Sequence, residues 1–319
     1  MAASREWTRL SFQEALELVK LPDESSEAQK CVRRFMSRQP AWEPGKELPW
    51  DSLGLAPPKI TRGAYGAVVY AQSSLAAARV VEQEDQEEGN GPSRNPAGPF
   101  PVSDAEAPLD NTCLTCLVTF KRPVPSPDDV QDTPPQERYR QILSSRKPDE
   151  WDPCPQADLD GLKAKFPNAG HGAFPILDMY KVDMTAFNAD KPIPDRRELI
   201  YYRLLKPIPK EDVNAHVVTH AFEADRNSLF MLGNHLGYGH DLGIAASLSY
   251  SFYVHVNAEE AVMEGDGWWI QEASWSRFSA GRGAMESRLW SPEGNHVATG
   301  YQDGIVLPMT AKPGRETRL

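Results

Sequence analysis

The last quarter of the chain predicts four β-strands joined by short links, and this pattern limits the fold more than any other. The stretch SLSYSFYVHV alternates between apolar residues, from Leu248 onward, and a set that begins with Ser247, Ser249 and Ser251. Such alternation is typical of a strand with one buried face. The stretches GWWIQEASWSRFS, RGAMESRLWSP and HVATGYQDGIVL follow it, and SPEGN supplies a tight turn before the last. We therefore expect an antiparallel sheet in this region.

A helix and two further strands precede this sheet. FPILDMYKVDM and ELIYYRLLKP are rich in branched and aromatic residues, which favours strands. Residues 211–225 begin with acids and carry apolar residues at helical spacing, which predicts a helix. The order indicates an α+β arrangement in which one long helix is wrapped by an antiparallel sheet.

Gln302 interrupts a row of very small side chains. In HVATGYQDGIVL one parity holds Ala298, Gly300, Gln302, Gly304 and Val306. Glycine weakens a strand unless something must come close to it. We expect the predicted helix to lie on this face, so that the Gln302 amide faces the helix.

The N-terminal half is less regular. Residues 11–21 and the Gly- and Ala-rich residues 63–81 predict helices, the second of them buried because nearly every side is apolar or small. An acidic loop rich in Gly and Pro and a strand at TCLTCLVTFKRP follow. We divide the chain into an N-terminal unit (1–122), a linker with one helix around ERYRQIL (123–172), and a C-terminal unit (173–319).

Composition argues against several classes of protein. The 319 residues carry 45 acidic and 34 basic side chains, a net charge of −11, and no basic stripe that would neutralise the phosphates of a nucleic acid. No apolar run is long enough to span a membrane, and the start MAASREWTRLSF has no apolar core of a secretory signal. The four cysteines are typical of a reduced intracellular protein rather than a disulfide scaffold.

Two pairs of residues have the spacing of metal ligands, and in both we favour another interpretation. Cys113 and Cys116 form C-x-x-C inside an apolar run without a second ligand pair, which favours core cysteines over zinc. His216 and His220 are four residues apart on the predicted helix but lack an obvious third ligand. We expect a partly buried histidine pair and no metal.

Asp225 is the one unusual acid of the predicted helix. It lies at the C-terminal end, where the macrodipole disfavours a carboxylate by about 0.3–1 kcal/mol. Either the acid is kept for a function, or the helix has ended and Asp225 begins the next loop. No G-x-S-x-G motif is present, so a serine nucleophile on a sharp turn is not indicated.

Several stretches resemble one known family. ASLSYSFYVH, ATGYQDGIVLP, AFEADRNSLFMLG and GAYGAVVYAQSSLAAA resemble motifs of the acyl-CoA thioesterase II (TesB-like) family, and are closest to its fungal-type members. The likeness extends from about residue 50 onward. It implies a double hot-dog fold, in which two helix-in-sheet units lie side by side in one chain.

The resemblance also implies an activity. Members hydrolyse acyl-CoA to free fatty acid and CoA without a covalent intermediate. We expect no cofactor and no metal. An Asp, a Ser or Thr and a Gln activate the attacking water; these match Asp225, Ser247 and Gln302. Ser247 rests on the resemblance alone, because strand parity groups it with Ser249 and Ser251. We also expect an acyl-CoA substrate and a homo-oligomer.

The first unit departs from the family. SLAAA runs directly into RVVEQEDQEE, so two strands that should follow the first helix are expected to be missing. This leaves open a non-catalytic hot-dog protein that binds acyl-CoA or a partner subunit. An enoyl-CoA hydratase is disfavoured because its Asp-x-x-x-x-His motif is not seen. The ending Thr317-Arg318-Leu319 resembles a peroxisomal address, with a cytoplasmic location as the alternative.

Overall fold

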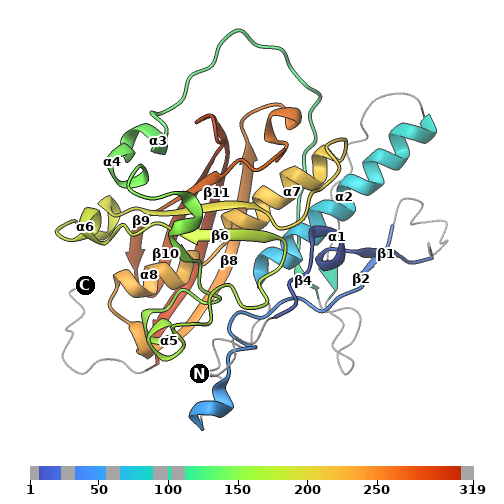
Figure 1. Cartoon of the computed structure of the whole chain (residues 1–319). Coiled ribbons are helices and arrows are strands. Elements are labelled where there is room, and N and C mark those ends of the chain that lie inside the picture. The colour runs from blue at the N-terminus through green and yellow to red at the C-terminus, as the bar shows by residue number, and fades with distance from the viewer. Residues whose placement is uncertain (1–6, 23–32, 55–64, 89–99, 102–111, 310–319) are drawn as a thin grey trace.

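Seven antiparallel strands form one sheet in the C-terminal half of the chain, in the order β5-β6-β7-β9-β10-β11-β8 (Figure 1). The computed structural model describes residues 7–22, 33–54, 65–88, 100–101 and 112–309. The strands are β5 (Asp152–Pro153), β6 (Leu177–Lys181), β7 (Glu198–Leu204), β8 (Leu242–Val254), β9 (Trp269–Ser279), β10 (Arg282–Trp290) and β11 (His296–Pro308). The six strands predicted in this half, β6 to β11, are confirmed.

Helices α7 (Val213–Ala224) and α8 (Ser228–His235) lie on one face of this sheet. The small residues of β11 allow this close approach. A Cβ atom added to Gly300 would lie 3.0 Å from the Ala224 Cβ, and one added to Gly304 would lie 2.5 Å from a methyl carbon of Leu229. The predicted helix on the small-residue face is therefore confirmed, and the sheet and helices together give the α+β class.

Helix α2 (Gly66–Glu88) lies beside α7 and runs antiparallel to it (Figure 1). At the start of α7, Arg79 forms an ion pair with Asp212 at 2.5 Å, and Asn214 donates to Glu82 at 2.7 Å. The predicted end of this helix at residue 81 is wrong. The acidic run EQEDQEE continues the helix because Glu and Gln are good helix formers and no Gly or Pro intervenes before Gly89.

Two further expectations for the N-terminal half are wrong. The helix predicted over 11–21 is only α1 (Phe12–Ala15), begun by a Ser11 cap, because the next residues pair as β1 (Leu18–Lys20) with β2 (Phe35–Ser37). The strand predicted at TCLTCLVTFKRP is only β4 (Thr112–Leu114), paired with the two residues of β3 (Phe100–Pro101). The lengths of α1 and β4 depend on which segments pair as strands, and the local sequence pattern does not show this pairing. The described strands of this half therefore form two two-stranded sheets.

The first part of the segment between the halves lies on the other face of the large sheet. Helices α3 (Pro135–Arg138) and α4 (Arg140–Leu143) occupy the place of the one predicted helix. Arg138 forms an ion pair at 2.5 Å with Glu272 of β9, and Leu143 packs in a second apolar cluster with Leu199 and Trp290. The division at residues 122 and 172 stays a prediction.

The remaining helices are short. They are α5 (Asp160–Lys165), α6 (Thr185–Asn188) and the single-turn 3-10 helices η1 (Trp50–Leu53), η3 (Pro148–Glu150), η4 (Ile193–Asp195), η5 (Gly239–Asp241) and η6 (Ala258–Ala261). Within the described ranges, no helix combines the length and the apolar character needed to cross a bilayer.

Candidate active site

The backbone carbonyls at the C-terminal end of α7 accept hydrogen bonds from neutral donors inside the protein. The helix carbonyls of its last turn have no partner within the helix and need one. Tyr250 donates its hydroxyl to the Ala221 carbonyl and Tyr65 donates to the Phe222 carbonyl, each at 2.9 Å. The helix can therefore end in the core, and Asp225 follows directly as its C-terminal cap.

Asp225 lies between two helix ends of opposite polarity. Its Oδ2 accepts a hydrogen bond from the backbone N–H of Ala67, in the first turn of α2, at 3.0 Å. The end of α7 disfavours a carboxylate, whereas the beginning of α2 favours one. The alternative in which the helix ends just before Asp225 is confirmed. The acid also has a specific partner, and its function stays a prediction.

The three predicted residues come together at this point. Gln302 of β11 donates from its Nε2 to Asp225 Oδ1 and, at 2.5 Å, to the Ser247 Oγ of β8. Asp225 is 9% exposed and Gln302 is 4% exposed, whereas Ser247 is exposed. The cluster is thus buried on the Asp and Gln side and reaches solvent through the serine.

A β-bulge explains how Ser247 turns toward Gln302. Ser249 pairs with Asp303, but Ser247 pairs with Gly304, so Leu248 is an extra residue in β8. One additional residue in a strand reverses which side chains face each side of the sheet. Even-numbered residues of β8 therefore face α7 on one side of the bulge, and odd-numbered residues face it on the other side. Tyr250 and Ser247 therefore face α7 together, and Leu248 is 55% exposed. The strict alternation predicted for this strand is wrong at Leu248.

Burial sets the proton affinity of the carboxylate. Burial raises the pKa of Asp225 to about 7. The hydrogen bonds from Ala67 and Gln302 and the nearby Arg226 cation lower this pKa, but their effect is smaller than that of burial. A carboxylate with a pKa near neutrality exchanges protons readily at neutral pH, which suits a general base.

Gln302 is held at both ends of its amide. Its Oε1 accepts a hydrogen bond from the hydroxyl of Ser228, the first residue of α8, which is 3% exposed. Sequence reasoning missed Ser228. The available signal was the Asn-Ser pair after Asp225, since both residue types favour the beginning of a helix.

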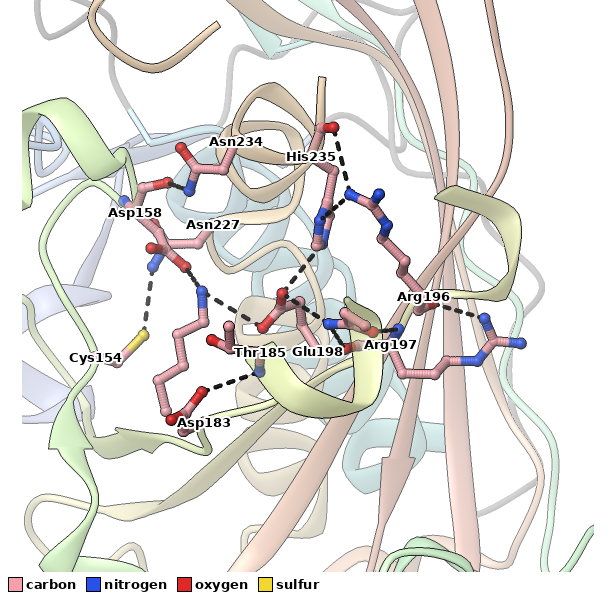
Figure 2. Close-up of polar contacts among 12 residues, drawn as sticks. Cys154, Asp158, Asp183, Thr185, Arg196, Arg197, Glu198, Asn227, Asn234 and His235 are labelled. Carbon is pink, nitrogen blue, oxygen red and sulfur yellow. Dashed lines mark hydrogen bonds and ion pairs between the residues drawn. The ribbon is translucent and has the colours of Figure 1, made fainter. Parts of the chain in front are cut away.

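A left-handed residue places Ser228 next to Asp225. Asn227 has a φ of +55°, and it joins α7 to α8. Its Nδ2 donates to the Cys154 Sγ at 3.3 Å, and its Oδ1 accepts from the backbone N–H of Asp158 at 3.2 Å. Figure 2 shows Asn227 beside Cys154 and Asp158. Asp158 in turn forms an ion pair with Lys181 at 2.5 Å. The turn that carries the site is thus fixed from a segment about 70 residues earlier in the chain.

The two predicted histidines belong to the core. His220 is bonded to the Tyr202 hydroxyl at 2.9 Å and to the Ala261 carbonyl at 2.7 Å, and burial lowers its pKa to about 4. His216 contacts the Pro209 carbonyl and is also fully buried, so the pair is more buried than predicted. Among the described residues, no group of three or more His, Cys, Asp or Glu side chains could hold a metal ion.

The cysteines differ from one another. Cys116, predicted as a core cysteine, is only half-buried, so that prediction is wrong. Cys154 is buried. The side chain of Cys113 lies outside the described residues.

Two hollows in the surface lie away from the cluster. One, of about 750 Å³, is lined by Lys210, Val213 and Trp269 beside the beginning of α7. The other, of about 350 Å³, is lined by Leu48, Gln156 and other residues of the 152–170 segment. Neither includes Asp225, so we identify the candidate site by its converging polar groups rather than by its volume.

A helix packed along one face of an antiparallel sheet defines the class of this protein, the hot-dog fold. Residues 148–306 match the acyl-CoA thioesterase C-terminal domain, and through them the chain belongs to the acyl-CoA thioesterase family. A search of curated proteins gave no match.

Solved structures give more distant likenesses. The acyl-CoA thioesterase II TesB2 from Mycobacterium marinum is 16% identical, with 93% of this chain and 98% of that chain covered and a TM-score of 0.49. The tesB protein of Mycobacterium avium subs paratuberculosis is 13% identical over 79% and 90%, with a TM-score of 0.44. A hot-dog protein of unknown function from Alicyclobacillus acidocaldarius is 12% identical over 93% and 97%, with a TM-score of 0.41.

Proposed function

We propose that the protein hydrolyses fatty acyl-CoA to free fatty acid and CoA, with Asp225 as the general base. The observation that carries this proposal is the convergence of Asp225, Ser247 and Gln302 in a chain of the acyl-CoA thioesterase family. A thioester needs only an oriented water, a base and a donor to the carbonyl oxygen.

Each side chain has one role. Asp225 takes a proton from the water as the water oxygen forms a bond to the thioester carbon. Ser247 accepts a hydrogen bond from Gln302, so its own hydroxyl proton is free to donate to the carbonyl oxygen. The oxyanion intermediate then collapses, the C–S bond breaks, and the CoA sulfur takes the proton back from Asp225.

Gly66 leaves space in front of these groups. A Cβ atom on Gly66 would lie 3.6 Å from Asp225 Oδ2 and 4.0 Å from Ser247 Oγ. A larger side chain here would fill the approach to both, so we assign this space to the thioester.

The test is release of free CoA from acyl-CoA substrates of increasing chain length by the purified full chain. We expect turnover by the wild type and a loss of at least about 100-fold in Asp225→Asn. Asp303→Asn is the matched control, because Asp303 neighbours Gln302 on β11 but forms an ion pair with Arg282 outside the site. Equal activity of wild type and Asp225→Asn would contradict the proposal.

A second candidate is a non-catalytic protein that binds acyl-CoA or a partner subunit. The described strands of the N-terminal half favour it, because they form two two-stranded sheets and not a sheet wrapped around α2. Calorimetry with acyl-CoA distinguishes the two: binding without CoA release supports the second candidate, and release excludes it.

We also propose a peroxisomal location and a homo-oligomer. The location rests on Thr317-Arg318-Leu319, which lie outside the described residues. A fluorescent protein fused to the N-terminus tests it: punctate signal that disperses when the tripeptide is deleted supports the peroxisome, and diffuse signal throughout supports the cytoplasm. Light scattering of the purified chain tests the oligomer.

A further inference from the structure

Ser228 lies behind Gln302, away from the side that the substrate would approach. Its hydroxyl donates to Gln302 Oε1, while Nε2 of the same amide faces Asp225 and Ser247. A glutamine side chain can present either end of its amide, and its partners decide which. Here both ends have partners of the matching kind: a hydroxyl donor at the oxygen and two acceptors at the nitrogen.

The orientation of this amide decides what Ser247 can do. With Nε2 toward Ser247, the serine oxygen accepts a hydrogen bond and its own O–H points elsewhere. If the amide turned over, Oε1 would accept a hydrogen bond from the Ser247 hydroxyl, and that hydroxyl would no longer be free to donate to the thioester oxygen. The reversed amide would also set Oε1 against the Asp225 carboxylate.

We propose, on the basis of the proposed function, that Ser228 is a positioning residue that holds the Gln302 amide in the orientation that frees the Ser247 proton for the substrate. Ser228 itself touches neither water nor thioester. It acts through Gln302.

The surroundings fix Ser228 firmly enough for this role. The indole N–H of Trp275 donates to the Ser228 carbonyl at 3.2 Å, and Asn227 before it is held by Cys154 and Asp158. A non-glycine residue with positive φ costs energy and persists only where its surroundings demand it. The strained turn at Asn227 puts the Ser228 hydroxyl within reach of Gln302.

The first test is kinetic. Ser228→Ala should lower kcat roughly tenfold with little change in KM, since one neutral hydrogen bond is lost. Ser228→Thr, which keeps the hydroxyl, should restore most of the rate. In a Gln302→Leu background the Ser228→Ala change should have no further effect; an equal loss in that background would show a merely structural role and overturn the proposal.

The second test does not depend on turnover. The Asp225 carboxyl is titrated by NMR in protein labelled with [13Cγ]Asp. Because the Gln302 hydrogen bond lowers the pKa of Asp225, Ser228→Ala should raise that pKa, and should leave it unchanged in the Gln302→Leu background. An unchanged pKa in Ser228→Ala overturns the positioning role. If the wild type releases no CoA but the pKa moves as expected, the positioning of Gln302 stands and the thioesterase proposal fails.

Discussion

The backbone N–H of Ala67 and the carboxylate of Asp225 are joined by a hydrogen bond of 3.0 Å, across 158 residues of sequence. Ala67 belongs to α2, outside the residues 148–306 that match the family domain. The charge of the proposed base thus depends on a helix of the N-terminal half. This contact gives that half a role in the site that does not require a second wrapped sheet.

Removal of this N–H should shift the pH dependence of the reaction. Ala67→Pro keeps the first turn of α2, where proline is tolerated, but removes the donor to Asp225. Since that hydrogen bond lowers the pKa of Asp225, the rise of kcat/KM with pH should move to more alkaline values. Ala67→Gly keeps the N–H and is the control; the same alkaline shift in Ala67→Gly would contradict the assignment.

Asp225→Asn should abolish activity and yet stabilise the fold at alkaline pH. The pKa of Asp225 rises from 3.8 to about 7 on folding, so the unfolded chain loses its proton first as pH increases. The unfolding free energy therefore decreases as the pH rises above the pKa of Asp225 in the unfolded chain, and this loss is complete above about pH 7. It amounts to at most about 4 kcal/mol. Melting temperatures should be higher for Asp225→Asn at about pH 8 and similar for both proteins below the unfolded pKa; a lower value at about pH 8 would count against the buried charge.

Ser247 and Ser249 should differ sharply although they share sequence parity. Only Ser247 faces Gln302, because of the bulge at Leu248. Ser247→Ala should lower kcat on the order of 100-fold by removing a donor to the carbonyl oxygen. Ser249→Ala should leave the kinetics unchanged. Equal losses in the two variants would mean that the bulge does not set the active face.

Lys181 should be a stability residue. Its ammonium lies 2.5 Å from Asp158 and 3.5 Å from Glu198, and both carboxylates are largely buried. Lys181→Met leaves both acids without this cation and should cost about 3–5 kcal/mol of unfolding free energy in urea titrations. The control is Lys163→Met, since the Lys163–Asp152 pair is exposed and should contribute less than about 1 kcal/mol. A loss in Lys181→Met no larger than in the control would refute the role of this network.

Sequence patterns predicted the elements that have their own periodicity. The strands β6 to β11 and helix α7 follow from alternation and helical spacing, and Gln302 was marked by its small neighbours. The lengths of α1 and β4 were not predictable, because they depend on pairing between segments that are separated in the sequence, β1 with β2 and β3 with β4.

The surroundings of the site depend on contacts that local patterns do not contain. Asp225 and Ala67 are far apart in sequence, and so are Ser228 and Gln302. The bulge at Leu248 reverses a parity that the sequence presents as unbroken. Ser247 was therefore assigned from the family resemblance against the periodicity, and the bulge accounts for the conflict.

The most direct measurement is kcat/KM for CoA release from about pH 5 to about pH 9, for the wild type and Asp225→Asn. With Asp225 as the base, the wild-type value should rise through an apparent pKa of about 7 and then level off. Asp225→Asn should be lower by at least about 100-fold and show no such rise. A wild-type rate that does not change over this range, or an Asp225→Asn variant that keeps the wild-type profile, would contradict the account.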